Sequence, residues 1–157
     1  MARARLGQRR DECAGHARVR GGRATPASRE RVLRLLLDTH ALIWFTGSPE
    51  LLAPTARDAI VEADVAVVSA ASVWEVSTKM RLGKLRPPSE ELLEELEEWS
   101  FDLLPITARH AWVAGGLPPH HRDPFDRILV AQAQLEGLTI VTRDPAIARY
   151  QVAVLAA

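Results

Sequence analysis

The sequence is poor in features that mark several classes of protein. Cys13 is the single cysteine among 157 residues, which excludes an intramolecular disulfide and fits a reducing cytoplasm. No stretch approaches the roughly 18–20 consecutive apolar residues that span a bilayer, so no membrane segment is expected. Hydrophobic residues nevertheless make up 47% of the chain, enough for the core of one domain.

Residues 1–31 lack lysine and nearly all large apolar side chains. They hold nine arginines against three acids, a net charge of +6, whereas residues 32–157 hold eleven basic and seventeen acidic residues, a net charge of −6. Such a segment cannot bury enough surface to order itself, so we predict a disordered Arg-rich extension. A nucleic-acid-binding arm is one interpretation. A misplaced start of translation is favoured, because Val32 directly precedes the first predicted strand and a GTG start would be translated there as valine.

Beyond this extension, short apolar runs alternate with segments of helical spacing. Strands are predicted at about 32–38, 65–68, 102–106, 138–142 and 152–155, and helices at 39–46, 48–63, 70–82, 90–100, 107–116, 124–136 and 145–149. The helix over 48–63 is expected to open at Ser48 and Pro49, since serine caps helices and proline suits their first position. Strands alternating with helices predict an α/β fold with three layers, α/β/α, around a central parallel sheet of four to five strands.

Four acidic residues are predicted to meet at one edge of this sheet. Asp38 ends the first strand and Asp144 follows the fourth, at the carboxyl edge where α/β proteins bind ligands. Glu75 and Asp126 lie in helices whose first turns open toward the same edge. Converging carboxylates repel one another and are costly to desolvate unpaired, so a divalent cation is expected among them. Oxygen ligands favour Mg²⁺ or Mn²⁺ over zinc.

Each acid also has a simpler interpretation as a local structural residue. Asp38 suits a helix N-cap, and Asp123 and Asp144 each precede a proline, a pattern typical of N-caps. Asp126 suits the first turn of a helix, where the dipole favours an acid. Glu75 can form an exposed ion pair with the lysine four residues later. Each local interpretation is plausible for one acid taken alone. Together they explain the whole set of acids less well than a shared cation site does.

Four segments together resemble one known family. They are LLDTHALIW at 36–44, VSAASVWEV at 68–76, HRDPFDRILVAQA at 121–133 and LTIVTRD at 138–144. In this order and spacing they resemble the PIN-domain ribonucleases, specifically the VapC-type toxins of bacterial type II toxin–antitoxin pairs. The resemblance covers essentially everything except the N-terminal extension and implies a PIN domain over residues 32–157.

This resemblance implies a Mg²⁺-dependent endoribonuclease, with Mn²⁺ as a second candidate metal, that hydrolyses RNA phosphodiester bonds with metal-activated water. The implied catalytic and metal-binding acids are Asp38, Glu75, Asp126 and Asp144, with Asp123 as a fifth metal ligand. The third acid of the family could correspond to either Asp123 or Asp126, and Asp126 is preferred from its distance to Gly137 and the following strand. A cognate antitoxin that blocks the site and a homodimer are the implied partners. The alternative is a catalytically silent PIN-like binding module that acts through a partner protein, although the complete acid set argues against it.

Hydroxyl and imidazole side chains flank the predicted acids. Thr39, Ser69 and Thr142 stand at strand ends, where each can either orient a carboxylate or cap a helix. The pair His120 and His121 suggests a zinc ligand or a general base. No second spaced histidine or suitable cysteine accompanies the pair, which argues against zinc.

Basic and aromatic residues supply further candidates. Three arginines can form hydrogen bonds to RNA phosphates and can also neutralise the neighbouring acids. They are Arg122, Arg127 and Arg143. Trp74 and Trp112 are expected in the core or in an interface, where aromatic residues are enriched.

Overall fold

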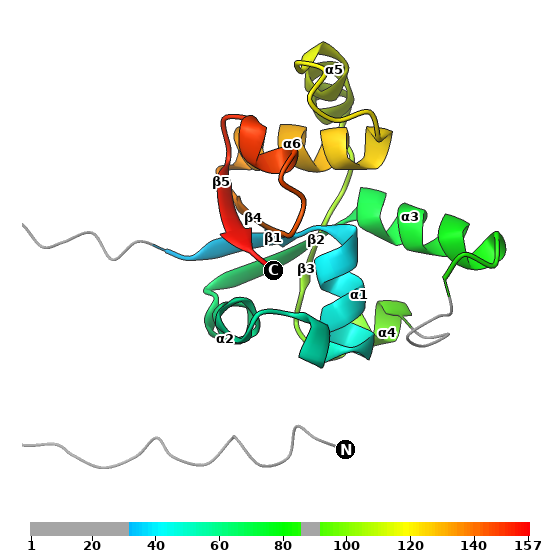
Figure 1. Cartoon of the computed structure of the whole chain (residues 1–157), viewed down its shortest axis with the longest axis vertical. Coiled ribbons are helices and arrows are strands. Elements are labelled where there is room, and N and C mark those ends of the chain that lie inside the picture. The colour runs from blue at the N-terminus through cyan, green and yellow to red at the C-terminus, as the bar shows by residue number, and fades with distance from the viewer. Residues whose placement is uncertain (1–31, 86–91) are drawn as a thin grey trace, which may run out of the picture. The chain divides into compact units, whose positions relative to one another are not determined.

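The computed structural model describes residues 32–85 and 92–157 and contains a five-stranded parallel sheet between layers of helices (Figure 1). The strand order is β3-β2-β1-β4-β5. The strands are β1 (Arg34–Leu37), β2 (Val65–Ser69), β3 (Asp102–Leu104), β4 (Thr139–Thr142) and β5 (Ala153–Ala156). The predicted three-layer α/β fold is therefore confirmed, with β1 at the centre of the sheet.

Helices connect the strands as the apolar spacing predicts. They are α1 (Thr39–Gly47), α2 (Pro54–Glu62), α3 (Ala70–Arg81), α4 (Leu92–Glu98), α5 (Ala108–Gly116) and α6 (Pro124–Glu136), with the 3₁₀ turns η1 (Pro49–Leu51) and η2 (Ile147–Arg149). Within 32–85 and 92–157, no helix is long and apolar enough to cross a membrane. The predicted extension at 1–31 and the first residues of the predicted helix 90–100 lie outside the described residues.

The predicted helix over 48–63 is wrong, because the chain divides there into η1 and α2. The side chain of Ser48 makes no cap hydrogen bond. Pro54 lacks a backbone N–H and disfavours the helical region for the residue before it, so Ala53 adopts a ψ of 136°. The helix therefore begins afresh at Pro54, and the preceding residues form only a short turn.

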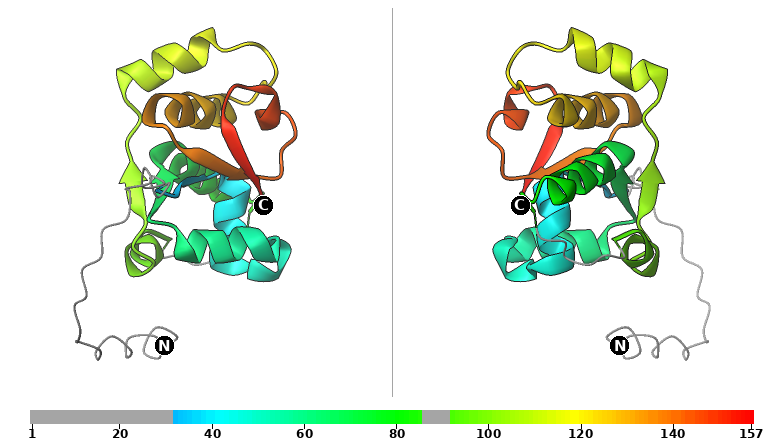
Figure 2. Two further views of the ribbon diagram at one scale, coloured as in Figure 1. Left: turned by 90° about the vertical axis from the view of Figure 1, so that its left-hand side faces the viewer. Right: turned by 90° about the vertical axis from the view of Figure 1, so that its right-hand side faces the viewer.

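Alternating residues of β1 supply cores on both faces of the sheet. Leu35 and Leu37 join one apolar cluster with side chains of α1, α2 and α4, whereas Leu36 joins a second cluster with side chains of α6. All three leucines are fully buried. Figure 2 shows from two sides that helices cover both faces of the sheet. Burial on both faces explains why the strand appears in the sequence as a continuous apolar run.

The two tryptophans expected in the core or an interface are both exposed, Trp74 by 62% and Trp112 by 85%. The core interpretation is therefore wrong for both. Trp112 lies on α5, which packs against α6 on the side away from the sheet (Figure 1). Trp74 lies on α3 and meets the edge of Phe125 with 5.0 Å between ring centroids. This contact joins α3 to the first turn of α6.

Burial predicts different free-energy costs for truncating two apolar side chains. Leu129 of α6 is fully buried against the sheet, so Leu129→Ala should lower the free energy of unfolding by about 2–5 kcal/mol. Val61 of α2 is 64% exposed, so the control Val61→Ala should change it by less than about 0.5 kcal/mol. Urea denaturation of the full chain measures both. Equal losses in the two variants would contradict this packing.

Candidate functional site

Asp38 stands at the carboxyl end of the central strand and is only 4% exposed. Its Oδ1 accepts a hydrogen bond from the backbone N–H of Ala41 at 2.7 Å, so the carboxylate caps α1 as the simpler interpretation expects. Burial raises the pKa of Asp38, opposed by the Ala41 N–H, the Thr142 hydroxyl and the charge of His40. Thr142 thus contributes a hydrogen bond to this acid, and its hydroxyl also accepts from the backbone N–H of Asp144 at 3.0 Å, the local role that the simpler interpretation expects.

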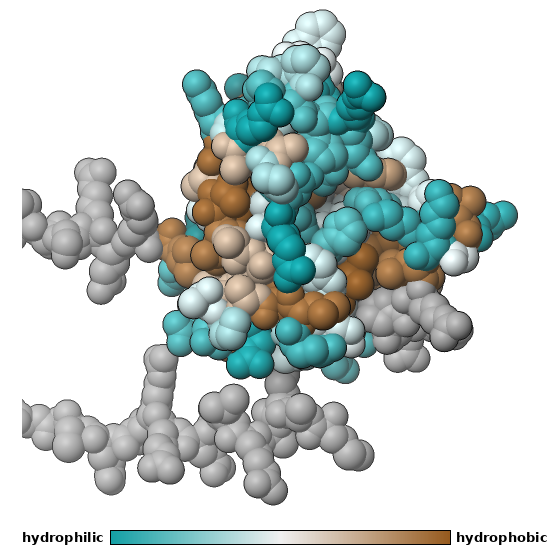
Figure 3. Space-filling model, viewed as in Figure 1, coloured by the Kyte–Doolittle hydropathy of each residue, from teal (hydrophilic) through white to brown (hydrophobic). Residues whose placement is uncertain are grey.

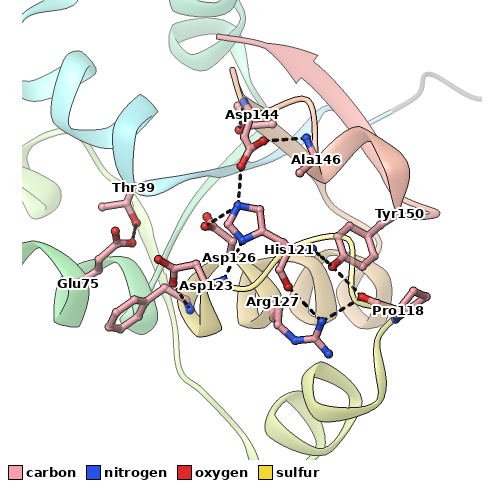
Figure 4. Close-up of polar contacts among 12 residues, drawn as sticks. Thr39, Glu75, Pro118, His121, Asp123, Asp126, Arg127, Asp144, Ala146 and Tyr150 are labelled. Carbon is pink, nitrogen blue, oxygen red and sulfur yellow. Dashed lines mark hydrogen bonds and ion pairs between the residues drawn. The ribbon is translucent and has the colours of Figure 1, made fainter.

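Glu75 lies on the buried face of α3 and is 6% exposed. The hydroxyl of Thr39 donates to Glu75 Oε2 at 2.5 Å, and Lys79 Nζ lies 2.5 Å from Oε1. The expected ion pair with Lys79 is present, but its acidic partner is buried rather than solvated. Thr39 thus orients a predicted acid from the first residue of α1 (Figure 4).

Asp126 lies in the first turn of α6, next to the other acids. Asp123 caps this helix, since its Oδ1 accepts from the backbone N–H of Phe125 at 2.9 Å. Burial raises the pKa of Asp126 to about 7, opposed by the charge of His121 and helped by the negative charges of Asp123, Glu75 and Asp38. Three of the acids predicted from the sequence, Asp38, Glu75 and Asp123, therefore act electrostatically on Asp126 at this edge of the sheet.

Asp144 joins the cluster through a histidine. Its Oδ2 lies 2.7 Å from Nε2 of His121, and the same nitrogen lies 3.3 Å from Oδ2 of Asp126 (Figure 4). The other oxygen of Asp144 accepts from the backbone N–H of Ala146 at 2.7 Å. Ligand atoms of His121, Asp126 and Asp144 all lie within 4.8 Å of one another.

Sequence reasoning raised His121 only as part of a histidine pair and did not connect it with the acids. The structure separates the pair, because His120 packs against Tyr150 with 5.0 Å between ring centroids while His121 enters the acid cluster. The only local signal was the position of His121 two residues before Asp123, the cap of α6. That spacing cannot reveal its contact with Asp144, which depends on how the preceding loop folds back.

Arg127 anchors this loop instead of facing solvent. Its guanidinium donates to five backbone carbonyls, those of Ala114, Gly115, Leu117, Pro118 and His121, at 2.7–3.3 Å. The Tyr150 hydroxyl donates to the Pro118 carbonyl at 3.0 Å and accepts from the backbone N–H of His121 at 2.8 Å. The guanidinium of Arg127 is therefore turned toward this loop and not toward RNA phosphates, and it pairs with no acid among residues 32–85 and 92–157.

Of the remaining candidates beside the acids, two make contacts within the fold and one is exposed to solvent. Arg143 lies over the Trp44 ring, 4.2 Å from its centroid, and donates to the carbonyl of Leu51. Ser69 caps α3, with its hydroxyl accepting from the backbone N–H of Ala71 at 3.0 Å. Arg122 is exposed, and no other side chain in the described ranges pairs with it.

The sequence matches the PIN domain family over residues 35–153. It is 33% identical over 113 residues to "Ribonuclease VapC22" of Mycobacterium tuberculosis, an alignment that covers 70% of this chain and 86% of that protein. All five predicted acids, from Asp38 to Asp144, fall inside the range that matches the family.

Two solved structures share the fold. The crystal structure of FitAcB from Neisseria gonorrhoeae superposes with a TM-score of 0.54 at 22% identity, covering 78% of this chain and 96% of that one. VapBC2 from Rickettsia felis, bound to a DNA fragment from their promoter, gives a TM-score of 0.57 at 13% identity, covering 77% and 96%. Together with the family match and the 33% identity, the fold shows that this chain belongs to the PIN domain family.

Proposed function

We propose that this chain is a divalent-cation-dependent endoribonuclease that cuts cytoplasmic RNA as the toxin of a VapC-type toxin–antitoxin pair. The observation that carries the proposal is the set of carboxylates around Asp126, whose pKa is raised to about 7 by burial and by the charges of Asp123, Glu75 and Asp38. The relative named a ribonuclease and the match to VapBC2 support the same assignment. A silent binding module would not need this electrostatically costly arrangement.

The residues of the site fit a hard divalent cation. Carboxylate oxygens are the ligands that Mg²⁺ and Mn²⁺ prefer, and a cation would offset the repulsion that raises the pKa of Asp126. Ser72, one turn before Glu75 on α3, has a buried hydroxyl without a hydrogen-bond partner in the described ranges. The proposed ligands are Asp38, Glu75, Asp126 and Asp144, with Asp123 as a fifth acid.

Neighbouring side chains hold the carboxylates of this site in a fixed arrangement before a phosphodiester binds. Thr39 and Thr142 hold Glu75 and Asp38 by hydrogen bonds, which keeps the carboxylates in place before RNA arrives. Burial and the neighbouring acids raise the pKa of Asp126 to about 7 without a cation, and a bound cation would favour the ionised carboxylate that can serve as its ligand. A bound divalent cation would supply Lewis-acid stabilisation of phosphate charge and would lower the pKa of water.

Removing single carboxylates tests the nuclease assignment. Asp38→Asn and Asp126→Asn should each slow cleavage of single-stranded RNA in Mg²⁺ or Mn²⁺ by about 10²-fold or more, and EDTA should abolish cleavage by the wild type. The matched control is Asp58→Asn on α2, whose side chain is 65% exposed, and it should cut at the wild-type rate. Cleavage by Asp38→Asn at the wild-type rate, or activity that persists in EDTA, would reject the mechanism.

The raised pKa of Asp126 predicts how stability depends on pH without a cation. An unfolded aspartate titrates near 3.8 and the folded one near 7, so the folded state binds more protons between these values. Stability should therefore fall as the pH rises from about 4 to about 7, by at most a few kcal/mol from this group. Thermal melts in EDTA should show this fall in the wild type and a smaller one in Asp126→Asn. Mn²⁺ should restore wild-type stability at pH 8, and a wild-type curve that is flat from pH 4 to 8 would contradict the assignment.

An apolar groove is the surface that we assign to the antitoxin. Two adjoining cavities of about 660 and 430 Å³ share Val73, Ser77 and Leu93 in their walls, between α3, α4 and β3. Leu93 and Leu103 beside them are 52% and 53% exposed. Hydrophobic residues gather along this side of α3 in Figure 3. A concave apolar surface of this kind suits the apolar face of a partner helix.

Placing a charge in the groove tests whether the antitoxin binds there. Leu93→Glu should weaken binding to the cognate antitoxin by at least about tenfold, since it buries an unpaired carboxylate. Val61→Glu, also on an exposed helical surface, is the control and should bind as the wild type does. Binding can be measured by calorimetry and the oligomeric state by light scattering. Unchanged antitoxin affinity together with loss of a homodimer would reassign the groove to a second copy of the chain.

A further inference from the structure

We infer that His121 is a positioning residue of the proposed cation site, which it serves by donating a hydrogen bond to its acids and not by ligating the cation. This inference rests on the proposed function. His121 lies in the loop before α6, with its ring between Asp126 and Asp144 (Figure 4). By composition alone, the three side chains would suggest a mixed nitrogen and oxygen site for a transition metal.

The position of the imidazole proton decides between these two roles. The backbone N–H of Asp123 donates to Nδ1 of His121 at 3.1 Å, so Nδ1 presents its lone pair to that donor. A neutral imidazole then carries its proton on Nε2. Ligation of a cation through Nε2 would move the proton to Nδ1, where it would face the N–H of Asp123. The tautomer that the backbone selects therefore directs an N–H toward the carboxylates.

Distances from Nε2 agree with a donor shared by two acceptors. Nε2 lies 2.7 Å from Oδ2 of Asp144, a normal length for a hydrogen bond to a carboxylate, and 3.3 Å from Oδ2 of Asp126. Because Oδ1 of Asp144 accepts from the backbone N–H of Ala146, both oxygens of this acid have a donor. The rotation of the Asp144 carboxylate is therefore set from both sides.

The main chain of His121 is held as firmly as its ring. Its N–H donates to the Tyr150 hydroxyl at 2.8 Å, and its carbonyl accepts from Arg127 at 3.3 Å. With the contact from Asp123, three hydrogen bonds from different parts of the chain fix where the ring points. This gives a role to Arg127 and Tyr150, which lie beside the acid cluster without belonging to it. Loss of such an outer hydrogen bond typically weakens metal affinity about 10–100-fold.

Two substitutions separate hydrogen-bond donation from ligation. His121→Leu removes the donor, and it should weaken Mn²⁺ binding to the full chain about 10–100-fold in calorimetric titrations. His121→Gln keeps an N–H at similar reach, and it should recover most of the lost affinity. His120→Gln is the matched control and should bind Mn²⁺ as the wild type does. Circular dichroism checks that each variant is folded.

Pulsed electron paramagnetic resonance of the Mn²⁺-loaded wild type supplies a test that needs no variant. We expect no strong ¹⁴N coupling from a directly bound imidazole. Such a coupling, lost in His121→Gln, would make His121 a ligand and overturn the inference, as would equal Mn²⁺ affinities of folded His121→Leu and wild type. Either result would leave the cation site itself intact. Failure of the wild type to bind Mn²⁺ at all would instead reject the proposed function, and the inference with it.

Discussion

Repulsion among buried carboxylates is the constraint to which the rest of this structure responds. The negative charges of three other acids act on Asp126, and burial together with these charges raises its pKa to about 7. Hydrogen-bond donors surround the cluster: the hydroxyl of Thr39 holds Glu75, and the imidazole of His121 holds Asp144. In the absence of a cation the cluster lowers the stability of the fold at neutral pH. A folded domain that retains such a cluster is therefore most simply explained by a cation that binds there.

Helix capping and a role in the site are compatible for these acids. Asp38, Asp123 and Asp144 each use one carboxylate oxygen to accept a backbone N–H at the start of a helix or turn. Capping does not use up the carboxylate of Asp144, because its Oδ1 accepts from Ala146 while its Oδ2 meets His121. Capping also restricts the rotation of each side chain. A carboxylate that caps a helix is therefore already oriented for its proposed role in the cation site. The two interpretations of the sequence were therefore never exclusive.

The sequence predicted the parts of this site that depend on local patterns. Parallel strands buried on both faces appear as apolar runs, so Asp38 could be placed at a strand end and all strands could be found. The division of the predicted helix 48–63 was missed because Ser48 looked like a cap, although Pro54 made a second helix start necessary. The sequence suggested other roles for His121 and Arg127, since their partners depend on a loop that contacts Tyr150 from the far end of the chain.

The reassignment of Arg127 changes how RNA would be attracted to the site. Residues 32–157 carry a net charge of −6, which opposes the approach of a polyanion. The guanidinium of Arg127 is turned toward backbone carbonyls, whereas Arg122 and Arg143 are exposed, with Arg143 stacked on Trp44. A cation bound by the acids would reverse the sign of the local field at the place where phosphate must bind. The same ion that relieves the repulsion among the carboxylates would then also serve as an electrostatic contact for RNA, beside the exposed Arg122 and Arg143.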